Sequence, residues 1–264
     1  MTTPVAVVTG ASSGIGRALA KQLDAEGYAL VLCDVNEPGL RETQAMLKRG
    51  SQRVTLDVSK RAAVEAMAAE VIARHGRIDL VINNAGVTVD ATIAEVSLED
   101  FEWLFGINFW GVVYGTKAFL PTMLAQRSGT IVNLSSVFGM IGVPQQGTYC
   151  AAKFAVRGFT ETLWAELEGT GVTAVCVHPG GIKTNIARDA RSQGTPEAKQ
   201  KLAADFAKAA RSTPEQAAEV ILRGVYDKKK RVMIGADAQV IQLMARLLPE
   251  SYTSIVTAAA RRVR

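Results

Sequence analysis

The sequence has few of the residues that hold metals or form disulfide frameworks. Its 264 residues include three cysteines and two histidines, and none of them stands at the spacing of a metal site. An odd number of cysteines without a paired pattern predicts reduced, buried thiols at Cys33, Cys150 and Cys176, as in a cytoplasmic protein. We therefore expect no metal, and we interpret His75 and His178 as structural residues.

The sequence also lacks a long apolar run and an excess of charge over most of its length. No run approaches the ~18 residues that span a bilayer, and Met1–Pro4 has no basic region like that of a signal peptide. We therefore expect a cytoplasmic location. The formal net charge of +5 lies entirely after residue 225, where eight lysines and arginines stand against three acids. The neutral remainder argues against a nucleic-acid partner.

Short apolar strands alternate with helical segments in the first third of the chain. We predict strands at Val5–Thr9, Tyr28–Asp34, Val54–Asp57 and Ile78–Asn83, and helices at Gly14–Glu26, Pro38–Lys48 and Arg61–Arg74. Buried strands joined by helices in this way form a parallel sheet that is covered on both faces. The fold class that follows is α/β, a Rossmann-like doubly wound parallel sheet.

The remaining chain continues this pattern without a repeat or a linker, so we interpret residues 1–264 as a single dinucleotide-binding and catalytic domain. We predict a helix opened by a capping box at Ser97–Asp100 and running past Pro121, strands at Thr130–Ser135, Val172–His178 and Arg231–Ile234, and helices at Gly147–Glu168, Thr213–Tyr226 and after Asp237. We interpret the polar residues 185–212, which follow the sixth strand, as a mobile substrate lid. The alternative is an ordinary surface insertion.

Three residues in the middle of the chain form a pattern suited to proton transfer. Tyr149 and Lys153 are four residues apart, so a helix places them on one face, and Ser136 lies thirteen residues earlier. A free phenol has a pKa near ~10. A cation about 4 Å away is worth on the order of 4 kcal/mol at an effective dielectric constant of ~20, enough to lower the pKa of Tyr149 toward neutrality. The Ser136 hydroxyl is suited to hold a substrate oxygen.

The first strand ends in a glycine-rich turn that predicts a dinucleotide site. Gly10, Gly14 and Gly16 lie between that strand and the next helix, where glycines let the backbone approach a pyrophosphate and the helix N-terminus supplies amide donors. Three glycines alone are a weak signal, but the strand before them and the helix after them strengthen it. Asp34 ends the second strand, where a carboxylate can accept hydrogen bonds from an adenosine ribose.

With these features in order, the chain from Val5 to about Asn185 resembles the short-chain dehydrogenase/reductase family. The segments that carry the resemblance are Thr9–Gly16, Asp57–Val58, Asn83–Gly86, Asn108, Ser136, Tyr149, Lys153 and Pro179–Thr184. The resemblance implies an NAD(P)-dependent oxidoreductase with a catalytic tetrad of Asn108, Ser136, Tyr149 and Lys153. It also implies that Asn108 holds a water in a proton relay and that Lys153 binds the nicotinamide ribose.

The same resemblance, together with the glycine turn, predicts the cofactor contacts. These residues are Gly10, Ser12, Ser13, Gly14, Ile15, Gly16, Asp34, Asp57, Val58, Asn84, Ala85, Gly86, Tyr149, Lys153, Pro179, Gly180, Ile182 and Thr184. Members of the family that prefer a 2′-phosphate carry a basic residue in the glycine motif or just after the acid, where this chain has Ser13 and Val35. We therefore expect NAD rather than NADP. Arg17 leaves the alternative open, because its long side chain could swing toward the ribose.

The loop that joins Ser136 to Tyr149 predicts a bulky apolar substrate, such as a steroid-, lipid- or aromatic-like alcohol. It must pass beside the site, and its side chains are apolar, so burying a hydrocarbon group there gains roughly 25 cal/mol per Å². The residues expected to bind substrate are Ser136, Phe138, Met140 and Val143.

The C-terminal segment 226–264 is basic and amphipathic. Its apolar stripe (Val240, Ile241, Leu243, Met244, Leu247 and Leu248) is flanked by Lys228–Arg231 and Arg261–Arg264. We favour packing of this stripe on its own domain or on a neighbouring subunit. Peripheral contact with a membrane surface is the weaker alternative.

The function that follows is that of an alcohol dehydrogenase, which interconverts a secondary alcohol and a ketone with NAD(H). The alternatives are an NADPH-dependent carbonyl reductase and, less favoured because the tetrad is complete, a non-catalytic dinucleotide-binding protein. The helices at 101–124 and 147–168 carry more apolar surface than one sheet face needs, in Phe105, Trp110, Val113, Phe119, Phe159 and Trp164. We therefore expect a homo-oligomer, a tetramer or a dimer, unless all of these residues are internal.

Overall fold

The core of the protein is a seven-stranded sheet in which every neighbouring pair of strands is parallel. A computed structural model describes residues 3–192 and 194–263. The strands are β1 (Val5–Thr9), β2 (Ala29–Asp34), β3 (Ser51–Thr55), β4 (Leu80–Asn83), β6 (Gly129–Leu134), β7 (Val172–Pro179) and β9 (Arg231–Ile234), and their order across the sheet is β3-β2-β1-β4-β6-β7-β9. The chain order reverses between β1 and β4, and a doubly wound sheet opens its ligand crevice at such a point.

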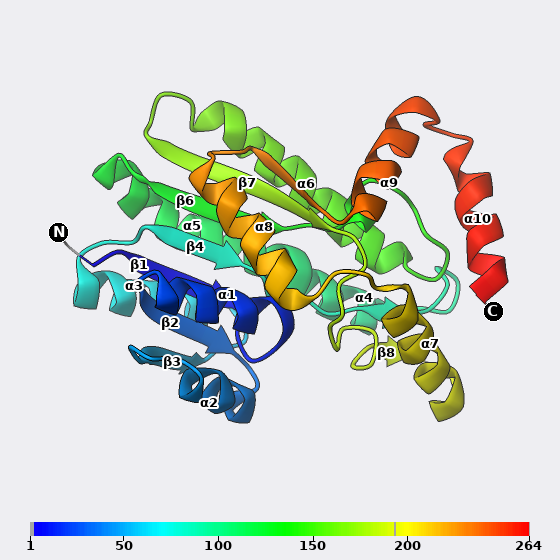
Figure 1. The fold of residues 1–264 in the computed structure, drawn as a ribbon, viewed down its shortest axis with the longest axis horizontal. Coiled ribbons are helices and arrows are strands. Elements are labelled where there is room, and N and C mark those ends of the chain that lie inside the picture. The colour runs from blue at the N-terminus through cyan, green and yellow to red at the C-terminus, as the bar shows by residue number, and fades with distance from the viewer. Residues whose placement is uncertain (1–2, 193, 264) are drawn as a thin grey trace.

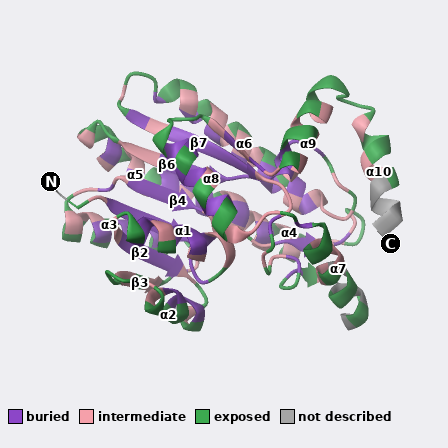
Figure 2. Ribbon diagram, in the orientation of Figure 1, coloured by how far each residue is buried: buried purple, intermediate pink, exposed green. Residues whose placement is uncertain are grey.

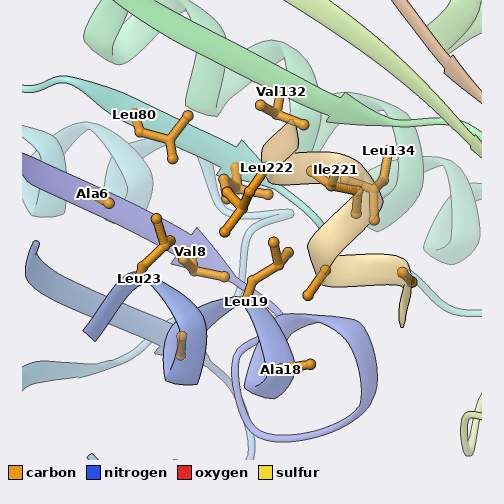
Figure 3. Close-up of a cluster of buried hydrophobic side chains, with 14 of the residues drawn as sticks. Ala6, Val8, Ala18, Leu19, Leu23, Leu80, Val132, Leu134, Ile221 and Leu222 are labelled. Atoms are coloured by element: carbon orange, nitrogen blue, oxygen red, sulfur yellow. The ribbon is translucent and has the colours of Figure 1, made fainter. Parts of the chain in front are cut away.

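Helices cover both faces of the sheet (Figure 1). They are α1 (Gly14–Ala25), α2 (Glu37–Ala45), α3 (Arg61–His75), α5 (Gly111–Gln126), α6 (Gly147–Glu166) and α8 (Pro214–Tyr226). Because side chains alternate along a strand, Val8 in β1 points to one face and Val7 to the other. On the first face, Leu19 and Leu23 of α1 and Ile221 and Leu222 of α8 pack over Val8, Leu80 and Val132 (Figure 3). Residues of α3, α5 and α6 fill the second face. The predicted fold class and the single domain are confirmed.

Apart from shifts of one to three residues at element ends, the structure differs from the sequence prediction in three respects. The edge strand β3 lies at Ser51–Thr55 rather than Val54–Asp57, because the Asp57 carboxylate turns back to accept hydrogen bonds from Ser59. The helix predicted from Ser97 is divided into α4 (Leu98–Phe105), a π-helical turn (Gly106–Trp110) and α5. Two short paired strands, β5 (Val89–Asp90) and β8 (Arg191–Ser192), were not predicted, since two residues show no periodicity.

The predicted lid, residues 185–212, contains β8 and the helix α7 (Pro196–Ala209). The side chains described in α7 are exposed or half-buried, and the helix extends from the body of the molecule (Figure 1). The structure therefore divides this segment into a part paired with the body and a part that is not. Its role as a lid stays a prediction.

After β9 the chain forms two helices, α9 (Ala236–Leu247) and α10 (Tyr252–Val263), whose described side chains are mostly exposed or half-buried (Figure 2). Val240, Leu243 and Leu247 of the predicted apolar stripe have exposed fractions of 65%, 57% and 65%. These three residues therefore do not pack on their own domain, and the other half of the expectation, packing on a neighbouring subunit, stays a prediction. Of the predicted terminal and basic positions, Met1, Thr2 and the side chains of Arg261–Arg264 lie outside the described residues. Within the described chain, no helix is both long and apolar enough to cross a membrane.

Candidate active site

The glycine turn is built from backbones that approach one another too closely for a side chain. A Cβ on Gly16 would lie 2.1 Å from the Gly10 carbonyl oxygen, and a Cβ on Gly10 would lie 2.9 Å from the Cα of Ala85. Gly10 also has a φ of 67°, in the region that favours glycine. The Asn84 side chain donates to the carbonyl oxygens of Thr9 and Gly10 at 2.8 and 3.2 Å. The turn after β1 is thus locked to the end of β4.

The N-terminus of α1 is open to an anion. Ser13 is the N-cap residue, but its side chain makes no capping hydrogen bond, and the first turn of the helix contains no acid. Backbone amides at such an end, with the helix dipole, favour a phosphate group. Beside them, the Asp34 carboxylate accepts hydrogen bonds from the backbone amides of Ser12 (3.0 Å) and Asn36 (2.9 Å). The acid predicted to meet the ribose therefore lies next to the turn.

Arg17 is committed to partners within the protein. Its guanidinium donates to the Thr43 hydroxyl at 2.9 Å, to the Ser12 carbonyl oxygen, and to the Glu42 carboxylate at 2.9 Å. A swing toward the ribose would break all three contacts. Val35, directly after Asp34, is 65% exposed and carries no charge. The residues around Asp34 that were considered for binding a 2′-phosphate therefore supply no free cation.

The remaining predicted cofactor residues follow the carboxyl ends of the strands. Gly86 faces two residues of the predicted tetrad, since a Cβ there would be 3.4 Å from Asn108 Oδ1 and 3.6 Å from Lys153 Nζ. The methyl group of Thr184 would lie 3.1 Å from a Cβ on Gly14. Buried Ile182 pairs with Ser212 in an isolated bridge. The segment after β7 therefore returns to the glycine turn.

The other members of that set are placed by backbone contacts along the same edge. The backbone amide of Gly180 donates to the carbonyl oxygen of Ile234, which directs the chain after Pro179 past the end of β9. Val58 packs against Gly111, where a Cβ would lie 2.8 Å from it. Asn83, before Asn84, ties β4 to β6 by a 2.8 Å hydrogen bond to Asn133.

Ser136, Tyr149 and Lys153 meet where β6 ends and α6 begins. Ser136 follows β6 by two residues, while Tyr149 and Lys153 lie on successive turns of α6. The Ser136 side chain lies close enough to the Tyr149 hydroxyl to lower the pKa of that phenol. Lys153 Nζ lies 5.6 Å from the centroid of the Tyr149 ring and donates to the Leu134 carbonyl oxygen at 2.8 Å. The structure therefore brings these three predicted residues together.

Burial dominates the electrostatics of this cluster. It raises the pKa of Tyr149 to about 12, against a smaller lowering by the hydrogen bond to Ser136. Burial also lowers the pKa of Lys153 to about 8. The predicted lowering of the Tyr149 pKa by Lys153 is therefore wrong for the protein alone. The reason is that the low-dielectric setting that would strengthen the lysine's influence also disfavours the charged phenolate.

Asn108 lies at the centre of the π-helical turn and is fully buried. Its side-chain oxygen accepts from the Val87 backbone amide and its nitrogen donates to the Val87 carbonyl oxygen, both at 2.8 Å. The side chain thus fixes the loop after β4, and its predicted hold on a relay water stays a prediction. The sequence did not reveal the π turn, although Gly106 and Gly111 flank it, and such turns recur at functional sites.

His178 is a buried neighbour of the cluster that the sequence analysis assigned only a structural role. Its Nδ1 lies 3.0 Å from the carbonyl oxygen of Ser136, and no part of the residue is exposed. Burial lowers the pKa of His178 to about 4, so the ring is neutral near pH 7. A neutral ring with a proton on Nδ1 donates this hydrogen bond. His178 therefore holds the backbone at Ser136 without contributing charge.

The loop after Ser136 lies against Tyr149. Phe138 packs edge-on against the Tyr149 ring, with centroids 6.1 Å apart and an interplanar angle of 88°. Phe138 and Val143 keep part of their surface exposed, whereas Met140 is buried. The Gly142 backbone amide donates to the Tyr252 hydroxyl at 3.0 Å, so α10 reaches this loop. Of the predicted substrate residues other than Ser136, two therefore retain surface that a ligand can touch.

Comparison with known proteins agrees with this geometry. A family model described as short chain dehydrogenase matches residues 4–195. The putative oxidoreductase SadH of Mycobacterium tuberculosis is 44% identical over 260 residues, which cover 96% of this chain and 94% of that protein. Dehydrogenase/reductase SDR family member 7B of Xenopus tropicalis is 34% identical over 98% of this chain and 86% of its own.

Solved structures give the same result. A short-chain dehydrogenase/reductase from Burkholderia phymatum in complex with NAD has a TM-score of 0.86 and 31% identity, covering 93% of each chain. A metagenomic short-chain oxidoreductase in complex with NADP has a TM-score of 0.73 and 26% identity, covering 89% of this chain and 97% of that one.

Proposed function

Since the chain belongs to the short-chain dehydrogenase/reductase family, we propose that it is an NAD(H)-dependent oxidoreductase that interconverts a bulky apolar secondary alcohol and its ketone. One observation supports this proposal above the others. The Tyr149 phenol lies beside the Ser136 side chain and the Lys153 ammonium, at the sheet edge that also bears the open N-terminus of α1. A proton-transfer group and a dinucleotide cradle at one edge are what a dehydrogenase needs.

The residues at this edge fit a nicotinamide dinucleotide, which when bound supplies the hydride acceptor or donor. The amides at the start of α1 would hold the pyrophosphate, and the Asp34 carboxylate would accept hydrogen bonds from the adenosine ribose. Lys153, buried and next to Gly86, would meet the ribose of the nicotinamide. The close packing of Gly10 against Ala85 keeps this surface free of side chains.

In the reduction direction, Tyr149 gives a proton to the ketone oxygen. A pKa of about 12 keeps the phenol protonated at neutral pH, so it is ready to act as an acid. Ser136 Oγ accepts a hydrogen bond from the Phe138 amide at 3.1 Å, which leaves its own proton to donate to the substrate oxygen. In the oxidation direction the phenol must first lose its proton against the burial that raises its pKa, and the Lys153 ammonium, 5.6 Å from the ring centroid, would offset part of that cost.

The preference for NAD over NADP is supported by the surroundings of Asp34. A carboxylate there repels a 2′-phosphate, Val35 offers no charge, and Arg17 is held by its own contacts. We expect kcat/KM with NAD to exceed that with NADP by at least about tenfold, which corresponds to ~1.4 kcal/mol. A higher kcat/KM with NADP would instead support the alternative, an NADPH-dependent carbonyl reductase.

The substrate class is tested by a series of secondary alcohols of increasing chain length, extended to a steroid alcohol. Turnover is followed by the near-ultraviolet absorbance of the reduced cofactor. We expect kcat/KM to rise with apolar size, because Phe138 and Val143 present hydrocarbon beside the site. A maximum at two- or three-carbon substrates would refute the apolar pocket. Tight dinucleotide binding without turnover of any alcohol or ketone would support the non-catalytic alternative.

We also propose that the protein forms a homo-oligomer through α4, α5 and α6. Phe119 and Val113 are buried in the core, so for these two residues the alternative of internal packing holds. In contrast, a chain of aromatic contacts runs from half-buried Phe101 through Phe105 and Phe109 to Trp110, which is 46% exposed. A second copy would cover this surface. Light scattering that gives a monomer at micromolar concentration would contradict it.

A further inference from the structure

Residues 185–192, here named the crossing segment, connect the two halves of the candidate site. The segment begins next to Thr184, whose methyl group lies against the glycine turn, and ends in β8, which pairs with β5. Between these ends, Ala187 and Ala190 are buried. After the crossing segment comes α7, which extends from the body and whose described side chains are not buried (Figure 1). The chain is thus fastened just before the exposed helix begins.

Arg191 holds the crossing segment to the body of the protein. Its backbone amide donates to the Thr88 carbonyl oxygen at 3.1 Å, and its guanidinium donates to the Asp100 carboxylate at 2.7 Å. The guanidinium carbon also lies 3.6 Å from the centroid of the Trp103 ring, a cation–π contact. Asp100 was predicted to complete a capping box with Ser97. Ser97 does accept from the Asp100 amide, but the Asp100 carboxylate binds Arg191 instead.

The contacts of Arg191 continue to the helix that carries the catalytic tyrosine. The Thr88 hydroxyl donates to the Gln146 side-chain oxygen at 2.8 Å, and the Ala91 backbone amide donates to the Gln145 carbonyl oxygen at 3.1 Å. Gln146 is the residue immediately before α6. Arg191 therefore joins the crossing segment and α4 to the loop after β4, and that loop to the start of α6.

We propose that Arg191 is a positioning residue that holds the crossing segment as a wall for a large apolar substrate. The inference rests on the function proposed above. When the crossing segment is no longer held, a substrate that extends beyond the reacting carbon loses apolar contact area with it. A small alcohol touches only Ser136 and Tyr149, and the dinucleotide is held by the glycine turn. Loss of the Arg191 contacts should therefore leave the binding of both unchanged.

The test compares Arg191→Gln with Arg188→Gln, a control in the same segment. Arg188 pairs at 2.9 Å with its neighbour Asp189, and both side chains are more than half exposed. In Arg191→Gln we expect about tenfold faster hydrogen exchange in residues 185–192, since a cation–π contact and an ion pair are lost together. We expect the KM for a long-chain or steroid alcohol to rise about tenfold as well, with kcat within about twofold. The KM for 2-propanol and the Kd for NAD should stay unchanged.

Further variants separate the causes. Asp100→Asn should reproduce part of the effect, and Arg191→Lys, which keeps the charge but loses the planar guanidinium, should fall between the wild type and Arg191→Gln. If hydrogen exchange in residues 185–192 is equally fast in Arg191→Gln and Arg188→Gln, Arg191 does not hold the crossing segment. Faster exchange with an unchanged KM, or a rise in the NAD Kd as large as the rise in KM, would overturn the positioning role. If no alcohol is turned over by the wild type, the proposed function fails, while hydrogen exchange still tests the fastening.

Discussion

The glycine turn is shaped by side chains that are absent, whereas the cluster around Tyr149 is shaped by side chains that are buried. Gly10 and Gly16 leave no room for a Cβ, and the groups available to a ligand there are backbone amides. At the other end of the site, Asn108 and Lys153 are 0% and 3% exposed, and burial shifts the pKa of both Tyr149 and Lys153. The first region is therefore sensitive to volume and the second to charge.

The largest effect we predict comes from adding one methyl group to the turn. In Gly16→Ala the new Cβ would lie 2.1 Å from a backbone oxygen that cannot move without displacing the turn. We expect a loss of about 3 kcal/mol in the free energy of unfolding, and a fall of about a hundredfold in NAD affinity. Urea unfolding and calorimetric titration with NAD measure the two quantities.

The matched control is Gly158→Ala in α6. A Cβ at Gly158 meets no atom within 4 Å. Alanine is the better helix former, so this variant should be more stable by about 0.5–1 kcal/mol and should bind NAD normally. If Gly16→Ala and Gly158→Ala had the same free energy of unfolding and the same NAD affinity, the turn would tolerate a side chain. The glycine turn would then not be the region that is sensitive to volume.

The second effect comes from the buried charge of Lys153. Lys153 has a folded-state pKa of about 8, below its ordinary value, so its burial destabilises the protein most at pH values below 8. Replacing it by methionine should therefore raise the free energy of unfolding at pH 7, by up to roughly 3 kcal/mol, while turnover is lost.

The pH dependence distinguishes this cause from a gain in packing. As pH rises from about 8 toward the unfolded-state value of Lys153, the folded protein becomes neutral at this position while the unfolded chain still binds the proton. The stability of the wild type should then approach that of Lys153→Met. A stability difference that stays constant across this interval would mean that charge burial at Lys153 costs little.

The effect that is smallest near neutral pH concerns His178, whose folded-state pKa of about 4 is also depressed by burial. Above the ordinary value of 6.5, both states are neutral and there is no penalty. Below it the unfolded chain gains a proton that the folded protein resists, so stability is lost as pH falls from 6.5 to about 4, by up to roughly 3 kcal/mol. Urea unfolding across this range should show a smaller loss for His178→Asn, whose amide can still donate to Ser136 but does not titrate. If the free energy of unfolding falls equally with pH in the wild type and in His178→Asn, the loss of stability does not come from His178.

The features that could be predicted from the sequence are those that depend on local geometry. The alternation of apolar strands and helices identified six of the seven sheet strands close to their positions, and the glycine spacing identified the turn, because a turn without Cβ atoms requires glycine. The i and i+4 spacing placed Tyr149 and Lys153 on one face of α6. These patterns carry their physical cause within a few residues of chain.

The features that the sequence did not reveal depend on contacts between distant segments. The sign of the Tyr149 pKa shift follows from burial under Phe138 and neighbouring elements, which no spacing encodes. The partner of Asp100 is Arg191, ninety-one residues later, which outcompetes the local capping role. His178 reaches Ser136 across forty-two residues, and β5 pairs with β8 through two residues each.

The most direct test of the account is Tyr149→Phe, which removes one hydroxyl and keeps the ring against Phe138. NAD affinity and alcohol oxidation are measured on the same preparation. The account predicts that kcat falls by at least about a hundredfold, the usual contribution of a general acid or base, while the Kd for NAD stays within about twofold, because the glycine turn is untouched. Turnover near that of the wild type would contradict the claim that the Tyr149 phenol moves the proton.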